Sequence, residues 1–96
     1  MRIIAKRTLF SMADQHGDCT TQVNWWYRIA KKATWGNLND IQEAFRHADS
    51  VGDKTVFNIK GNDYRLIVYI DYAHGTIYIK GLLTHAEYNK GPWKDK

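Results

Sequence analysis

With 96 residues, 44% of them hydrophobic and only one proline, the chain is too apolar to be disordered and too short for a second globular unit. We therefore expect a single domain over residues 1–96, and its net charge of +4 weakly favours nucleic acid among the possible partners. The one cysteine, Cys19, excludes an internal disulfide, and no apolar run approaches the roughly 20 residues of a membrane span, so we expect a cytoplasmic protein with no membrane partner.

The first half of the chain has the apolar spacing of helices behind one short strand. We expect a strand and then three helices, the third of them short, at residues 2–5, 6–16, 20–33 and 38–45. Gly17 ends the first helix, and Asp18 and Asn37 are expected to cap the second and third helices.

The buried faces of these helices follow from apolar residues spaced three and four positions apart. In the second helix the apolar stripe runs from Val23 to Ala30 through either Trp26 or Tyr27. The third helix is expected to bury its apolar residues Ile41, Ala44 and Phe45. The tryptophans of this region are expected to be packing anchors rather than platforms for nucleobases: Trp25, Trp26 and Trp35.

From residue 54 onward the apolar pattern has the period of two that is typical of strands. We expect three strands that form an antiparallel meander, at residues 55–59, 64–72 and 76–83. Turns at residues 60–63 and 73–75 join them. The predicted fold class is therefore α+β, with the helices on one face of a twisted sheet.

One face of this meander has a composition that suits RNA. Arg65 and Tyr69 share the more polar face of their strand, and Tyr78 and Lys80 share a face of the next strand. If these faces coincide, cations that hold phosphates lie beside rings that stack on unpaired bases. The alternative is an ordinary solvated sheet face with cross-strand pairs.

Residues 84–90 follow the last strand and are rich in groups that transfer protons. His85 and Glu87 are two potential metal ligands without a third nearby, and we expect no metal and no cofactor. Taken alone, His85 has the ordinary interpretation of a surface or capping histidine. The second helix presents Arg28, Lys31 and Lys32 on one side, which is either a solvated face or a track for RNA phosphates.

Two stretches of the chain, Val56–Leu66 and Thr84–Tyr88, resemble the signature segments of HigB-type toxins in the RelE superfamily. Further segments match the same pattern, so the resemblance covers nearly the whole chain: Met1–Ile4, Trp25–Trp35 and Ile41–Asp49. It implies a RelE-like fold of one strand, helices and an antiparallel sheet, in agreement with the elements predicted above.

The resemblance also implies an activity and a set of partners. The chain would be the toxin of a type II toxin–antitoxin pair, a ribosome-dependent endoribonuclease (mRNA interferase) that cuts translated messenger RNA and inhibits growth. Cleavage would be metal-independent and use the 2′-hydroxyl group of the RNA as the nucleophile. The expected partners are a cognate HigA-like helix-turn-helix antitoxin and messenger RNA on the ribosome, with operator DNA contacted only through the antitoxin complex.

The site residues implied by the resemblance combine a cation with groups that transfer protons. Arg65 is expected to stabilise charge on the scissile phosphate, and His85 to act as general acid or base. Tyr88 is expected to stack on a base or to orient a proton path. The expected phosphate contacts are the basic side chains Lys60, Lys80, Lys90, Arg28, Lys31 and Lys32.

Several alternatives stay open. Some members of the superfamily have an adjacent histidine and tyrosine, whereas two residues separate His85 from Tyr88 here, so Glu87 and Asp63 are alternative bases. A second hypothesis is a non-catalytic RNA-binding or ribosome-binding module that uses the same basic face. A third is a protein-interaction domain whose acidic segment 37–53 contacts a basic partner.

Overall fold

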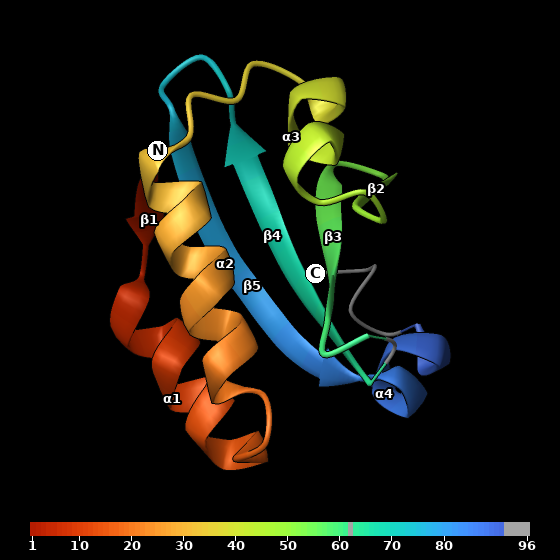
Figure 1. Ribbon diagram of the computed structural model, residues 1–96. Coiled ribbons are helices and arrows are strands. Elements are labelled where there is room, and N and C mark those ends of the chain that lie inside the picture. Colours follow the sequence, from red (N-terminus) through yellow and green to blue (C-terminus); the bar gives the residue numbers. More distant parts are fainter. Residues whose placement is uncertain (62, 92–96) are drawn as a thin grey trace.

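The computed structural model describes residues 1–61 and 63–91 and contains a five-stranded sheet, with helices α1, α2 and α3 on one face (Figure 1). The elements in chain order are β1 (Arg2–Ile4), α1 (Lys6–His16), α2 (Thr20–Lys32), α3 (Leu38–Ala44), β2 (Asp49–Val51), β3 (Lys54–Ile59), β4 (Tyr64–Asp71), β5 (Thr76–Thr84) and α4 (His85–Lys90). The strand order is β1-β5-β4-β3-β2, in which β1 runs parallel to β5 and the other neighbours are antiparallel. The α+β class and the meander are confirmed; Asn62 of the predicted turn at 60–63 lies outside the described residues.

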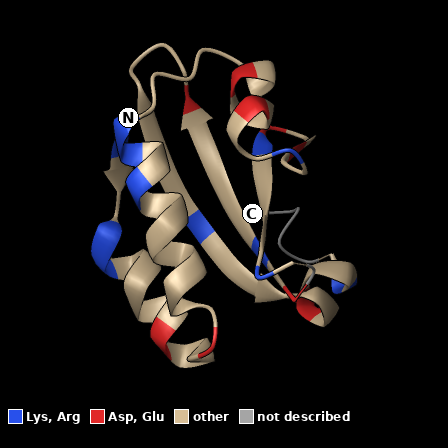
Figure 2. Ribbon diagram, in the orientation of Figure 1, with Lys and Arg blue, Asp and Glu red and all other residues tan. Residues whose placement is uncertain are grey.

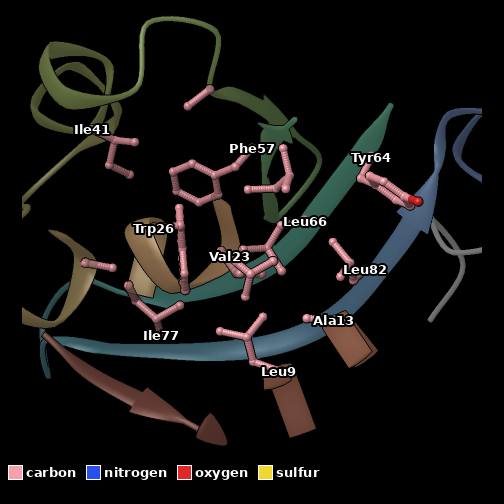
Figure 3. Packing of buried hydrophobic residues seen from close by; sticks show 14 of the residues in the cluster. Leu9, Ala13, Val23, Trp26, Ile41, Phe57, Tyr64, Leu66, Ile77 and Leu82 are labelled. Atoms are coloured by element: carbon pink, nitrogen blue, oxygen red, sulfur yellow. The ribbon is translucent and has the colours of Figure 1, made fainter. Parts of the chain in front are cut away.

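The main core lies between the sheet and the three helices α1, α2 and α3 (Figure 3). The ring of Trp26 on α2 meets the ring of Phe57 on β3 edge to face, with 5.3 Å between the ring centroids. Successive helix residues point about 100° apart, so only one of two adjacent tryptophans can face the sheet. Trp26 is 1% exposed and Trp25 is 66% exposed. The packing-anchor prediction is thus confirmed for Trp26 and Trp35 and wrong for Trp25.

Two predictions about the helix ends and faces are wrong. Cys19, not Asp18, occupies the N-cap of α2, and Asp18 uses its carboxylate for contacts with the sheet. Ala44 is exposed because α3 ends there, at the rim of a groove, whereas Ile41 one turn earlier is fully buried. The predicted cap at Asn37 is confirmed, since its side chain accepts a hydrogen bond of 3.0 Å from the Asp40 backbone N–H.

The structure contains two elements that the sequence analysis did not predict. The strand β2 has three residues, too few for an alternating pattern to be visible, and it pairs with β3 at the edge of the sheet. The helix α4 has six residues and begins directly at the end of β5. Its signal was present in the sequence: Thr84 and Glu87 have the spacing of a capping box, which marks a helix start.

The strand β5 contains a β-bulge at Lys80, where its register with β4 shifts by one residue. One extra residue in a strand reverses the alternation of side chains beyond it. Ile79 and Leu82 therefore both pack against the helices, although they are three positions apart. Tyr78 and Leu83 both lie on the opposite side of the sheet, which we call the open face.

The two adjacent tryptophans of α2 provide a test of this packing. We expect Trp26→Ala to lower the free energy of unfolding by about 3–5 kcal/mol, because it leaves a cavity beside Phe57. Trp25→Ala should change it by less than about 0.5 kcal/mol. Urea unfolding followed by circular dichroism measures both values, and equal losses in the two variants would contradict the orientation of α2.

Candidate active site

Three side chains that the sequence analysis selected, Arg65, His85 and Tyr88, come together where β4 begins and β5 ends. An Arg65 guanidinium nitrogen, Nη2, lies 3.2 Å from His85 Nδ1. The guanidinium carbon of Arg65 lies 5.5 Å from the centroid of the Tyr88 ring. We call these three residues the Arg65 centre.

Strand pairing explains why residues 20 positions apart in the chain meet. The antiparallel register places Arg65 opposite Leu83 and Tyr64 opposite Thr84, so the residue after β5 lies beside the start of β4. The backbone N–H of His85 donates to the carbonyl oxygen of Asp63 over 3.0 Å, which extends this contact past the end of the strand pair. The backbone of β4 and β5 therefore positions His85 beside Arg65.

The capping box of α4 holds the backbone that carries His85. Thr84 Oγ1 accepts from the Glu87 backbone N–H at 3.2 Å, and Glu87 Oε1 accepts from the Thr84 backbone N–H at 2.9 Å. The second bond is the main reason that the pKa of Glu87 lies below its usual value. A carboxylate that caps a helix and binds protons weakly is a poor general base, so this geometry disfavours Glu87 in that role.

The contact between Arg65 and His85 has a defined direction. A guanidinium group can only donate hydrogen bonds, so His85 Nδ1 must be the acceptor. A hydrogen bond between the two groups therefore requires the tautomer of His85 whose Nδ1 atom carries a lone pair. A second bond of 3.2 Å, from Arg65 Nη1 to the Tyr64 carbonyl oxygen, fixes the other arm of the guanidinium group.

The ring of Tyr88 closes a small apolar cluster on the open face. Val56 and Ile67 are buried at its centre, and Val51, Leu83 and Tyr88 pack around them. One face of the Tyr88 ring is thus turned to the guanidinium group of Arg65. In this arrangement Tyr88 holds the arginine by a cation–π contact, a role that the sequence analysis did not predict.

The structure brings the predicted basic and aromatic residues of the meander to one face of the sheet. Tyr69 pairs with Tyr78 across β4 and β5, and their ring centroids are 6.1 Å apart. Lys80 Nζ lies 6.0 Å from the Tyr78 ring centroid. Because side chains alternate along β4, Arg65 and Tyr69 share the open face.

Lys60 lies apart from the Arg65 centre, in a contact with Asp18 that joins the loop after α1 to the turn before β4. Lys60 Nζ is 2.8 Å from Asp18 Oδ2, and the Tyr64 hydroxyl donates to Asp18 Oδ1 over 2.6 Å. The hydrogen bond from Lys60 is the main cause that lowers the pKa of Asp18. The hydrogen bond to Asp18 raises the pKa of Tyr64 to about 12.

The other predicted phosphate contacts are divided between two regions. Lys90 ends α4, the helix of the Arg65 centre. Arg28, Lys31 and Lys32 are exposed on α2, which covers the opposite face of the sheet. Figure 2 shows basic residues where α1 begins and α2 ends, and acidic residues on α3, the helix of the acidic segment. The structure therefore does not bring the basic residues of α2 to the Arg65 centre.

A groove of about 400 Å³ between α2, α3 and β3 is a feature that the sequence analysis missed. The exposed Trp25 lies on its wall, with Ile29, Phe45 and Ile59. The signal was the pair of adjacent tryptophans, since one of them had to point away from the core.

Within residues 1–61 and 63–91, no group of three or more His, Cys, Asp or Glu side chains is arranged to hold a metal ion. Cys19 is buried and unpaired with other cysteines, and burial raises the pKa of its thiol. In the described part of the chain no helix has the length and apolar character required to cross a membrane.

The chain is similar to a known toxin family and to a protein named as an mRNA interferase. Residues 19–91 match the family described as HigB toxin, the RelE-like toxic component of a toxin–antitoxin system. The chain is also 26% identical, over 93 residues, to the mRNA interferase HigB of Escherichia coli O6:H1, an alignment that covers 94% of this chain and 90% of that protein. The matched family segment contains the Arg65 centre and the whole meander.

The Asp18 contacts predict a dependence of stability on pH. A carboxylate whose pKa is lowered in the folded state stabilises the fold above its ordinary pKa, and this contribution is lost as the pH falls through the folded pKa. We therefore expect the difference in free energy of unfolding between wild type and Asp18→Asn to shrink between about pH 5 and pH 2.

Urea unfolding at these two pH values measures that difference. Asp14→Asn, which changes an exposed carboxylate on α1, is the control and should show a smaller change. A difference for Asp18→Asn that stays constant between the two pH values would contradict the proposed contribution.

Proposed function

This chain belongs to the HigB family of RelE-like toxins, and we propose that it is a ribosome-dependent endoribonuclease that cuts translated messenger RNA and inhibits growth. Residues 1–96 act as one domain in this proposal. The observation that carries it is the meeting of a guanidinium group, an imidazole and a phenol ring at the Arg65 centre, with 3.2 Å between Arg65 and His85.

The proposed reaction needs no nucleophile from the protein and no metal ion. The 2′-oxygen of the RNA attacks the neighbouring phosphorus and loses its proton to a base, while the bond from phosphorus to the 5′-oxygen breaks. An acid protonates that 5′-oxygen. The products are a 2′,3′-cyclic phosphate and a 5′-hydroxyl group, so the protein has to transfer protons and stabilise charge on the phosphate.

Arg65 is the group that stabilises this charge. Two nitrogens of its guanidinium group donate hydrogen bonds, Nη1 to the Tyr64 carbonyl oxygen and Nη2 to His85 Nδ1. A phosphate is a stronger acceptor for a guanidinium group than either of them, because the bond is assisted by charge on both sides. Binding of the scissile phosphate would therefore draw the Nη2 arm away from His85.

His85 is the proton-transfer group. It is exposed, and its Nδ1 atom becomes available when Arg65 turns to the phosphate. The ring can then accept the proton of the 2′-hydroxyl, or in its charged form protonate the 5′-oxygen. The carboxylate of Glu87 is occupied as the cap of α4, which favours His85 over Glu87 as the proton-transfer group.

Phosphates on either side of the cut would contact nearby lysines. Lys80 lies beside the Tyr78 ring, between Tyr78 and Leu83 on β5, and Lys90 ends α4. Lys60 and the basic residues of α2 would add salt-dependent affinity for ribosomal RNA or messenger RNA without contacting the scissile phosphate.

The partner that follows from the family is an antitoxin. We propose that it is a HigA-like helix-turn-helix protein that neutralises the nuclease and binds operator DNA, so that the toxin reaches DNA only through the complex. The toxin would act in the cytoplasm, where messenger RNA is translated. No cofactor enters this scheme.

Substitutions in the Arg65 centre test the nuclease proposal. We expect Arg65→Ala and His85→Ala each to lower the cleavage rate at least about 100-fold, because each removes a group that acts on the transition state. Arg65→Lys should not restore the rate, since an ammonium group cannot reproduce the forked contact with phosphate. Mapping the 5′ ends of messenger RNA fragments in a reconstituted translation system measures the rates.

Matched controls are available for both positions. His74→Ala changes an exposed histidine on the turn between β4 and β5, and Arg46→Ala changes an exposed arginine after α3; both should cut as wild type does. If the wild-type chain binds ribosomes but produces no cuts, the nuclease proposal fails and the non-catalytic binding module takes its place.

A further inference from the structure

We propose that Tyr69, Tyr78 and Lys80 form a second RNA subsite on the open face, which stacks one unpaired base and holds the adjoining phosphate. We call it the tyrosine subsite. The identification of the bound strand as messenger RNA rests on the proposed function. The subsite itself is an independent claim about binding, because neither stacking nor phosphate contact at these residues requires cleavage.

The arrangement of the two rings is the first support. Tyr69 is 37% exposed, and the planes of Tyr69 and Tyr78 meet at 38° with 6.1 Å between centroids. The helices α1, α2 and α3 cover the opposite face of the sheet. A base can therefore reach these rings from the open face and stack on one of them.

Lys80 is the second support, because it adds a cation to what would otherwise be an ordinary cross-strand tyrosine pair. The lysine is exposed, and Nζ lies 6.0 Å from the Tyr78 ring centroid. It lies at the bulge of β5, and bulges re-aim side chains. Asp71, a carboxylate on the same face of β4, accepts hydrogen bonds from the backbone and ring of His74 and is turned to the loop.

The distance from the Arg65 centre sets where in the RNA the stacked base lies. Arg65 and Tyr69 are four residues apart on one strand, which corresponds to about 13 Å. A stacked single strand advances about 3.4 Å per nucleotide, and an unstacked strand advances further. The tyrosine subsite therefore takes a base within about four nucleotides of the scissile phosphate. Lys80 lies between Tyr78 and Leu83, the residues of β5 that pair with Tyr69 and Arg65.

The surface between the two sites is apolar. Ile67 lies between Arg65 and Tyr69 on β4, and it is buried with Val56 beneath Val51, Leu83 and Tyr88. A strand that passes between the sites can contact the half-buried Leu83 and Tyr88 but not the two buried residues. Stacking on a tyrosine ring needs a base but does not read its edge. Recognition at the tyrosine subsite should thus depend on the presence of a base and little on its identity.

The test compares two uncleavable probes on the purified full chain: a nine-nucleotide 2′-O-methyl oligouridine and an abasic strand with the same number of phosphates. Fluorescence anisotropy measures each dissociation constant. The double variant Tyr69→Leu, Tyr78→Leu should weaken oligouridine binding about five- to a hundredfold and leave binding of the abasic strand unchanged. Lys80→Met should weaken binding of both probes.

Two further variants separate stacking from other effects. Tyr69→Phe, Tyr78→Phe keeps both rings and should bind oligouridine like wild type. Tyr72→Leu removes a tyrosine that is also 37% exposed but lies after the end of β4, and it should have no effect. The proposal is overturned if the double Leu variant binds oligouridine like wild type, or if it loses affinity for both probes equally.

A measurement on the unmodified chain covers the case in which the double Leu variant does not fold. The ring-proton NMR signals of Tyr69 and Tyr78 should shift further on addition of oligouridine than on addition of the abasic strand, and equal shifts with the two strands would overturn the proposal. Base-dependent binding without any cleavage would refute the nuclease and keep the subsite. Cleavage that depends on Arg65, with equal affinity for both probes, would refute the subsite alone.

Discussion

The register between β4 and β5 sets both the position of the Arg65 centre and the division of side chains between the two sheet faces. It joins the start of one strand to the end of the other, so the backbone alone brings Arg65 within reach of His85. The bulge at Lys80 allows β5 to place Leu82 in the core and Tyr78 on the open face. Without the extra residue, either Leu82 would leave the core or Tyr78 would leave the open face.

The hydrogen bond between Arg65 and His85 links charge stabilisation to proton transfer. An imidazole that accepts from a guanidinium group is neutral, and its Nδ1 lone pair is occupied. A bound phosphate would compete for the same guanidinium arm and free that lone pair. In the proposed nuclease the histidine would thus become competent when the substrate arrives, and the contacts of Arg65 with Tyr64 and Tyr88 would keep the arginine in place during the exchange.

Periodicity was enough to predict the long elements and the face on which Arg65 and Tyr69 lie, because burial of one face leaves a pattern in the residues themselves. The failures have physical reasons. Asp18 has the right type and place for a helix cap, but Tyr64 and Lys60, more than 40 positions away, compete for its carboxylate. No local pattern contains such a contact. The bulge is equally invisible, since one extra residue preserves an alternating pattern on each side of it.

The family resemblance selected Arg65, His85 and Tyr88 as site residues. The structure adds the hydrogen bonds and the ring contact that hold these side chains in place. That resemblance pointed to the segment of His85 and Tyr88, but not to the helix that carries both. It also did not predict that Glu87 is used as a cap, which follows from its place three residues after Thr84. The edges of the sheet have a different consequence. The short β1 pairs with only the first part of β5, up to Tyr78, and further along the same strand His16 on α1 contacts the Leu82 carbonyl oxygen at 3.3 Å. A helix thus shields a strand edge that would otherwise be a template for another chain, which favours a toxin that stays unaggregated when it is released from its partner.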